Sequence, residues 1–149
     1  MKSLYILFAF LSAITNTSDD LKVEEGWLTD YDSAISLAKK EKKNVLVYFT
    51  GSDWCSPCKM LKKDLFESED FKKLSEEYVL LKVDIPRNKD LLTPEQYSHN
   101  KGVLSKLNKK GIFPLLVALS PRGVLLDEYS GYSMNGDVRY HLEFLNKNK

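Results

Sequence analysis

The chain has 149 residues, with 22 basic and 21 acidic side chains, two cysteines and a net charge of +1. A chain of this length supports one domain around one hydrophobic core. Because phosphate binding requires an excess of basic charge, this balance argues against a nucleic acid as a partner.

The N-terminal residues have the pattern of a secretory signal. Lys2 provides a positive charge, and the segment from Leu4 to Ile14 is apolar apart from Ser12. This run is shorter than the roughly 20 residues that a membrane-spanning helix needs, but it suits a signal peptide. We therefore predict a signal peptide over residues 1–17, with cleavage between about 15 and 20, and a single domain over 18–149. An uncleaved anchor or a buried N-terminal element is the alternative.

The next part of the chain predicts a strand, a helix and a second strand. Residues 26–28 indicate a short edge strand, and Thr29 or Asp30 can cap a helix that runs to about Lys43. The continuous apolar run from Val45 to Phe49 predicts a strand that is covered on both faces.

The only two cysteines, Cys55 and Cys58, follow this strand in the sequence WCSPCK. A helix can begin here, because Pro57 lacks an N–H that would have no helical partner in the first turn. The N–H groups at a helix start favour a thiolate on the first cysteine. The second thiol is close enough to attack a mixed disulfide formed on the first. The spacing therefore predicts dithiol–disulfide exchange.

Two other interpretations of the cysteine pair have less support. As a structural staple, a disulfide that closes so short a loop contributes only about 2 kcal/mol, against about 4.7 kcal/mol for a 100-residue loop. As a metal site, the pair would need His99 and His141, which lie far along the chain and form no second paired ligand motif. We therefore expect no metal.

The second half of the chain continues the alternation of helices and strands. Helical residues over 57–78 are interrupted at 67–70, where Ser68 can cap a second helix. We then expect, in order, a strand at 79–84, a polar loop at 86–97, a helix at 98–110 closed by Gly111, hairpin strands at 114–119 and 124–129, and a helix at 137–146 capped by Asn135 or Asp137. This order predicts an α/β fold with a central mixed sheet and helices on both faces.

This order of elements, with WCSPCK after the second strand and Phe113-Pro114 at the start of a later one, resembles the thioredoxin fold. The sequences FTGSDWCSPCK, LFE, KVDIPR and IFP, followed by Gly131-Tyr132, resemble the exported thioredoxin-like proteins of Gram-negative bacteria. The resemblance covers about residues 22–147.

The resemblance implies a role for each residue that matches its motifs. Cys55 would be the nucleophilic thiol, exposed at the carboxyl edge of the sheet, and Cys58 the resolving thiol. Phe113-Pro114 would form a cis peptide bond that faces the cysteines. With Trp54 and Ile112, it would form an apolar rim that binds extended polypeptide. The resemblance also implies a redox-active disulfide in place of a dissociable cofactor.

The sequence also departs from the family pattern beside the motif. Thioredoxins carry a buried acid on the strand before the cysteines, and Tyr48 stands at that place, with Leu80 near the position of its partner lysine. The proton of Cys58 must then pass to water, Lys59, Asp53 or another group. If they are not simply solvated, Asp53 should raise the pKa of Cys55 and Lys59 should lower it.

Two functions follow from these observations. The first is an exported thiol–disulfide oxidoreductase, in the periplasm or secreted, with protein thiols and disulfides as substrates and a redox partner protein. We expect it to be a monomer with no membrane span once the signal is removed. Reduction, isomerisation and oxidation are all compatible with the motif. The second is a polypeptide-binding or chaperone-like module whose cysteine pair is incidental.

Overall fold

The structure is a computed structural model, and it describes residues 26–149, so the predicted signal peptide lies outside the described residues. Its elements, in chain order, are β1 (Trp27–Leu28), α1 (Tyr31–Glu41), β2 (Asn44–Thr50), α2 (Ser56–Leu61), the π-helical turn η1 (Lys62–Phe66), α3 (Glu69–Ser75), β3 (Tyr78–Asp84), the 3₁₀ turn η2 (Lys89–Leu91), α4 (Pro94–Leu107), β4 (Leu115–Leu119), β5 (Leu125–Ser130) and α5 (Arg139–Lys147).

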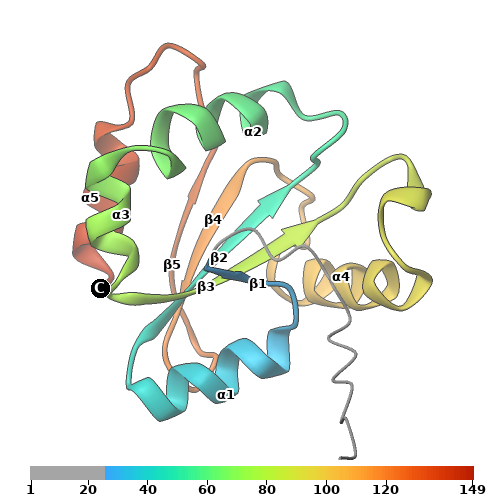
Figure 1. Ribbon diagram of the computed structural model, residues 1–149, viewed down its shortest axis with the longest axis horizontal. Helices are drawn as coiled ribbons and strands as arrows, with labels where there is room; N and C mark the ends of the chain where they lie inside the picture. The colour runs from blue at the N-terminus through green and yellow to red at the C-terminus, as the bar shows by residue number, and fades with distance from the viewer. Residues whose placement is uncertain (1–25) are drawn as a thin grey trace, which may run out of the picture.

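The strands form one mixed sheet in the order β1-β3-β2-β4-β5. β1, β3 and β2 run parallel, whereas β4 pairs antiparallel with both β2 and β5. Figure 1 shows this sheet between α1 and α4 on one side and α2, α3 and α5 on the other. The predicted α/β thioredoxin-like architecture is therefore confirmed.

Alternate residues of the central strands face opposite cores, as strand geometry requires. On β2, Leu46 and Tyr48 belong to the cluster that also contains both cysteines, while Val45, Val47 and Phe49 pack against α1 and α4. Burial on both faces explains why β2 is a continuous apolar run in the sequence. It also fixes which face of the sheet carries the cysteines.

Oxygen-bearing side chains cap the starts of α1, α3 and α4. The carboxylate of Asp30 accepts a hydrogen bond from the Ser33 N–H, and the Ser68 hydroxyl accepts one from Phe71. Both caps match the sequence prediction. The third, Thr93, caps α4 by accepting from the N–H of Gln96.

The segment predicted as a loop, 86–97, is more ordered than expected. It contains η2, and α4 begins at Pro94 rather than at residue 98. Thr93, Pro94 and Gln96 form a capping sequence with proline at the first helical position, which explains the early start. The same helix ends at Leu107, where Asn108 rather than Gly111 terminates it.

The last helix also differs from its prediction at the start. α5 begins at Arg139, and its N-cap residue, Val138, makes no side-chain capping hydrogen bond. Asp137 nevertheless accepts a hydrogen bond from the Arg139 N–H.

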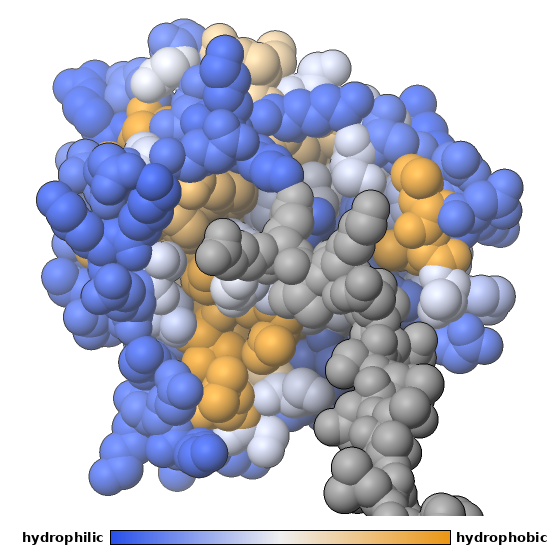
Figure 2. Space-filling view, in the orientation of Figure 1, coloured by the Kyte–Doolittle hydropathy of each residue, from blue (hydrophilic) through white to orange (hydrophobic). Residues whose placement is uncertain are grey.

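The surface of the described residues is mixed in character. Figure 2 shows hydrophilic residues around most of the visible outline, with hydrophobic residues between them. Within residues 26–149 we find no helix that is both long enough and apolar enough to cross a bilayer.

Candidate active site

The two cysteines form a disulfide at the point where β2 leads into α2. The S–S distance is 2.05 Å, and the two Cα atoms lie 5.2 Å apart. Cys55 is the N-cap residue of α2, and its Sγ accepts a hydrogen bond from the N–H of Cys58 over 3.3 Å. The first sulfur therefore lies where helix N–H groups stabilise a negative charge.

Both cysteines are buried in this oxidised state. Cys55 is 3% exposed and Cys58 is 1% exposed, so the expectation of an exposed Cys55 is wrong. The disulfide and the N–H of Cys58 hold the Cys55 sulfur at the helix start. Phe113 and Tyr132 also pack against the cluster that contains it.

The residues predicted to form the apolar rim come from two segments. The Phe113–Pro114 peptide bond is cis. The ring of Phe113 meets that of Trp54 edge-to-face, with 5.3 Å between the ring centroids. Ile112 is 37% exposed and is held by two backbone hydrogen bonds with the Asn108 side chain.

Trp54 has a fixed place in the structure. Its indole N–H donates to the carbonyl oxygen of Ile85 over 2.8 Å, and the guanidinium of Arg87 lies 4.8 Å from the ring centroid. The indole also lies over Gly51, where a Cβ atom would overlap the ring. The segment after β3 therefore fixes the residue that precedes Cys55.

The Asp53 carboxylate contacts this same segment. It accepts hydrogen bonds from the N–H groups of Asn88, over 2.8 Å, and Arg87, over 3.0 Å. The Asn88 N–H is the main reason why the pKa of Asp53 lies below its usual value, and the Arg87 N–H lowers it further. The ammonium of Lys59 lies 3.4 Å from the Asp53 carbonyl oxygen. The effect of either residue on the pKa of Cys55 stays a prediction.

A cavity of about 290 Å³ lies behind Cys58 on the side of β2 and β3. The buried Tyr48 reaches it, and its hydroxyl donates to the Cys58 carbonyl oxygen over 3.0 Å. The remaining lining residues are aromatic, hydroxylic or basic: Trp27, Thr50, Ser52, Lys59, Lys62, Phe66 and Lys82. The hydroxyl of this buried tyrosine therefore has a hydrogen-bond partner.

Asp64, Tyr132 and His141 form a further cluster on the side of α5, which was not predicted as part of the site. The Tyr132 hydroxyl donates to the Asp64 carboxylate, and the ring of Tyr132 packs edge-to-face on that of His141. Nε2 of His141 lies 3.1 Å from the Gly131 carbonyl oxygen. The N–H of Gly131 in turn donates to the carbonyl oxygen of Pro114. The sequence shows Gly131-Tyr132 as a motif, but its partners meet only in the folded chain.

The histidines are not brought together with the cysteines as metal ligands. Nε2 of His99 accepts a hydrogen bond from the N–H of Tyr31, and His141 lies against Gly131. Within residues 26–149, no group of three or more His, Cys, Asp or Glu side chains is arranged to hold a metal ion.

Comparisons with known proteins agree with this geometry. The sequence model of a family described as thioredoxin-like matches residues 26–121. The disulfide bond reductase DsbH of Chlamydia pneumoniae is 29% identical over 111 residues, which cover 74% of this chain and 65% of that protein. The thioredoxin-related protein DsbJ of the same organism is 35% identical over 75 residues, which cover 50% of this chain and 21% of that protein. The chain thus spans less than two thirds of the length of either relative.

Solved structures show the same fold. A structure described as DsbH oxidoreductase is 25% identical with a TM-score of 0.70, and the match covers 83% of this chain and 85% of that one. A thioredoxin from Thermus thermophilus is 20% identical with a TM-score of 0.61, over 81% of this chain and 84% of that one.

Proposed function

This chain belongs to the thioredoxin-like family, and on that premise we propose that it is a thiol–disulfide oxidoreductase acting on protein substrates through Cys55 and Cys58. The observation that carries the proposal is the Cys55–Cys58 disulfide at the start of α2. The name of the relative DsbH, a disulfide bond reductase, supports it.

The proposed reaction begins from the reduced pair. The Cys55 thiolate attacks a sulfur of the substrate disulfide, a mixed disulfide forms, and one substrate cysteine leaves as a thiolate. The Cys58 thiolate then attacks the Cys55 sulfur and releases the second substrate cysteine. The cysteine pair loses two electrons and the substrate gains them. A redox partner protein restores the dithiol, and no dissociable cofactor takes part.

The rim around the disulfide is the proposed substrate-binding surface. Trp54, Ile112, Phe113 and Pro114 would contact an extended polypeptide, with the backbone of Phe113 pairing with it as an added strand does. The aromatic contact between Trp54 and Phe113 and the exposure of Ile112 support this role.

We further propose that the protein is exported to the periplasm, by means of a signal peptide over residues 1–17, and acts as a monomer. The positive charge of Lys2 and the apolar run after it support export. Cell fractionation together with the mass of the mature chain tests this. A protein that keeps residues 1–17 and stays in the cytoplasm would contradict export.

Cysteine variants test the reaction. In an insulin-reduction assay, Cys55→Ser should abolish activity, whereas Cys58→Ser should accumulate mixed disulfides with substrate because nothing resolves them. The double variant gives the background. Full activity of Cys55→Ser would overturn the proposal. Titration of the pair against glutathione then separates a reductase, with a potential near the value of about −270 mV of thioredoxin, from an oxidase or isomerase with a higher one.

The burial of both cysteines supports a second candidate, a polypeptide-binding module in which the pair is incidental. This candidate predicts that the reduced thiols resist alkylation and that clients bind equally well when both cysteines are serine. Rapid, pH-dependent alkylation of one thiol near neutrality would exclude it.

A further inference from the structure

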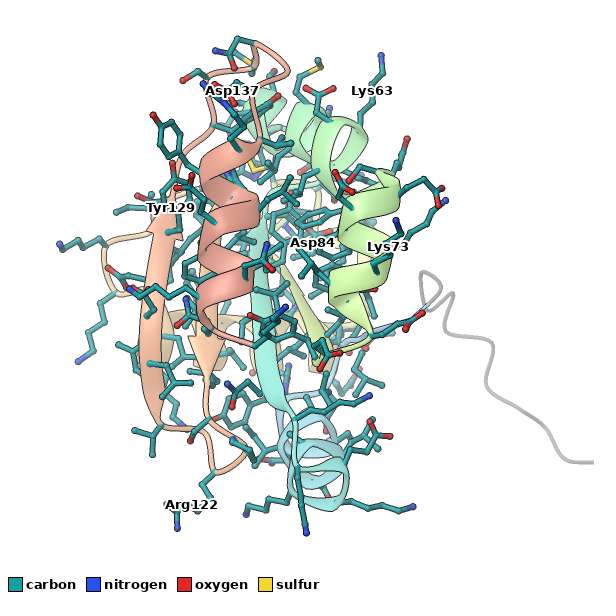
Figure 3. All side chains as sticks on the ribbon, turned by 90° about the vertical axis from the view of Figure 1, so that its left-hand side faces the viewer. Lys63, Lys73, Asp84, Arg122, Tyr129 and Asp137 are labelled. Atoms are coloured by element: carbon teal, nitrogen blue, oxygen red, sulfur yellow. A yellow bond between two sulfur atoms is a disulfide. The ribbon has the colours of Figure 1, made fainter. Side chains whose placement is uncertain are left out.

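A groove of about 280 Å³ lies between the C-terminal end of α4 and the edge strand β5. Its apolar lining consists of Leu107, Ile112, Leu115 and Leu125. Two of these side chains are open to solvent, since Ile112 is 37% exposed and Leu125 is 53% exposed. Figure 3 shows β5 at the outer edge of the sheet, with Arg122 in the turn that precedes it. We call this feature the β5 groove.

The register of β4 and β5 defines the face on which the β5 groove lies. Leu125 pairs with Leu119, and Glu128 pairs with Val117. Both β4 residues belong to the cluster that packs against α1 and α4. Because paired residues of neighbouring strands project to the same face of a sheet, Leu125 and Glu128 lie on the α4 side, opposite to the cysteines.

Ile112 joins the β5 groove to the proposed substrate-binding rim, because it belongs to both. The buried side chain of Asn108 accepts a hydrogen bond from the Ile112 N–H over 3.0 Å and donates one to its carbonyl oxygen over 2.7 Å. An incoming polypeptide therefore meets the side chain of Ile112. From there the groove follows the register from Leu115 toward Leu125, a stretch of roughly 13 Å that about four extended residues can span.

Three lysines give the β5 groove a positive charge. Lys109 and Lys110 are exposed, and neither forms an ion pair with any residue in the described part of the chain. The ammonium of Lys106 donates to the Tyr31 hydroxyl over 3.1 Å, which is a neutral partner. Glu128 is the acid in the lining, so the positive charges outnumber the negative one.

We propose that the β5 groove binds one flank of the polypeptide substrate, an extended segment of about four residues in which apolar and acidic side chains alternate. This inference rests on the proposed exchange function and names the substrate class of that site. The apolar side chains would contact Leu107, Leu115 and Leu125, while the acidic ones would lie beside the lysines. Charge complementarity of this kind speeds association and discriminates against basic segments.

The test uses two peptides that differ only in charge. Each carries one cysteine in a disulfide with mercaptoethanol, flanked on both sides by four residues. In these flanks leucine alternates with glutamate in one peptide and with lysine in the other. Stopped-flow measurements at low salt give the second-order rate constant with the reduced protein. Each constant is divided by that of dithiothreitol with the same peptide, which removes the intrinsic reactivity of the disulfide.

The unmodified protein should prefer the acidic peptide by about tenfold or more. High salt should reduce this preference, because it screens exposed charges. The double variant Lys109→Glu/Lys110→Glu should abolish or reverse it. Lys39→Glu/Lys40→Glu is the matched control, since this adjacent, exposed pair in the last turn of α1 does not line the groove. The control changes the net charge equally and should keep the preference.

A second pair of variants tests the apolar contact. Leu125→Ser should slow the reaction of both peptides several-fold. Leu126→Ser is its control, because Leu126 is 48% exposed but does not line the groove, and it should leave both rates unchanged. Thermal unfolding identifies any variant that fails to fold, and Lys109→Gln/Lys110→Gln then replaces the charge reversal and should weaken the preference.

Three results would overturn the inference. The first is an equal normalised rate for the two peptides with the unmodified protein. The second is a full preference for the acidic peptide in the folded Lys109→Glu/Lys110→Glu variant. The third is a dimer in sedimentation that Leu125→Ser dissociates, which would assign the groove to a second copy of the chain. Failure of the proposed function is distinct, because it would appear as inactivity of the unmodified protein in the insulin assay.

Discussion

The hydroxyl of Tyr48 donates a hydrogen bond to the backbone carbonyl oxygen of Cys58 over 3.0 Å. This contact joins β2 to α2, the helix that carries Cys58. The same carbonyl also accepts the helical hydrogen bond from the N–H of Lys62. The Tyr48 side chain therefore fixes the backbone of α2 at the second cysteine of the pair.

Removing this hydroxyl should weaken the fold. Tyr48→Phe leaves the second lone pair of the Cys58 carbonyl oxygen without its protein partner, so we expect a loss of about 1 kcal/mol in the free energy of unfolding. Urea denaturation of the oxidised protein measures it. Tyr140→Phe, at an exposed tyrosine of α5, is the control and should be neutral. Equal stability of the two variants would show that the buried contact contributes nothing.

Gly51 should be required for the placement of Trp54. In Gly51→Ala the new Cβ overlaps the indole, which must then move away from the Ile85 carbonyl oxygen. We expect a destabilisation of about 1–3 kcal/mol and a change in tryptophan fluorescence. Gly102→Ala is the matched control, because Gly102 lies inside α4 with no atom within 4 Å of the added Cβ. That variant should gain up to about 1 kcal/mol, and an equal gain in Gly51→Ala would disprove the packing argument.

The Asp53 carboxylate should hold the segment after β3 against the redox motif. An amide cannot reproduce both acceptor bonds, so Asp53→Asn should speed hydrogen exchange at the N–H groups of Arg87 and Asn88. Because these bonds lower the pKa of Asp53, wild-type protection should persist below the usual range near pH 4 and disappear as the pH falls further. Protection that is independent of both pH and the substitution would contradict this role.

His141 should make stability depend on pH. Burial lowers its pKa below the ordinary value of 6.5, while the contacts with Gly131 and Asp137 oppose that shift. The unfolded chain therefore binds more protons, so this contribution to stability is complete above about pH 6.5 and is lost as the pH falls toward the folded pKa. His141→Gln keeps a donor for the Gly131 carbonyl oxygen and removes the titration.

Thermal unfolding at pH 7 and pH 5 measures the effect of this histidine. The midpoint of the unmodified protein should fall more on acidification than that of His141→Gln. A parallel fall in both proteins would assign the pH dependence to other groups. His99→Gln, at the partly exposed histidine that contacts α1, is the comparison.

The sequence predicted the elements whose signals are local. The apolar runs located β2 and β3 to within one residue at either end, because a strand buried on both faces must be apolar throughout. Ser68 correctly marked the start of α3. The start of α4 also has a local signal, in Thr93-Pro94 and Gln96, but the polar composition of that segment predicts a loop instead.

The sequence by itself determined the fold class and the position of the cysteine pair: two cysteines three positions apart after a buried strand, in a thioredoxin-like order of elements. Only the tertiary structure decided what surrounds them. The register of β2 against β3 put Lys82 on the side of Cys58, and the path of the chain after β3 brought Ile85 and Arg87 onto Trp54. Such contacts join residues some 30 positions apart, so they depend on strand pairing and packing that no local pattern records.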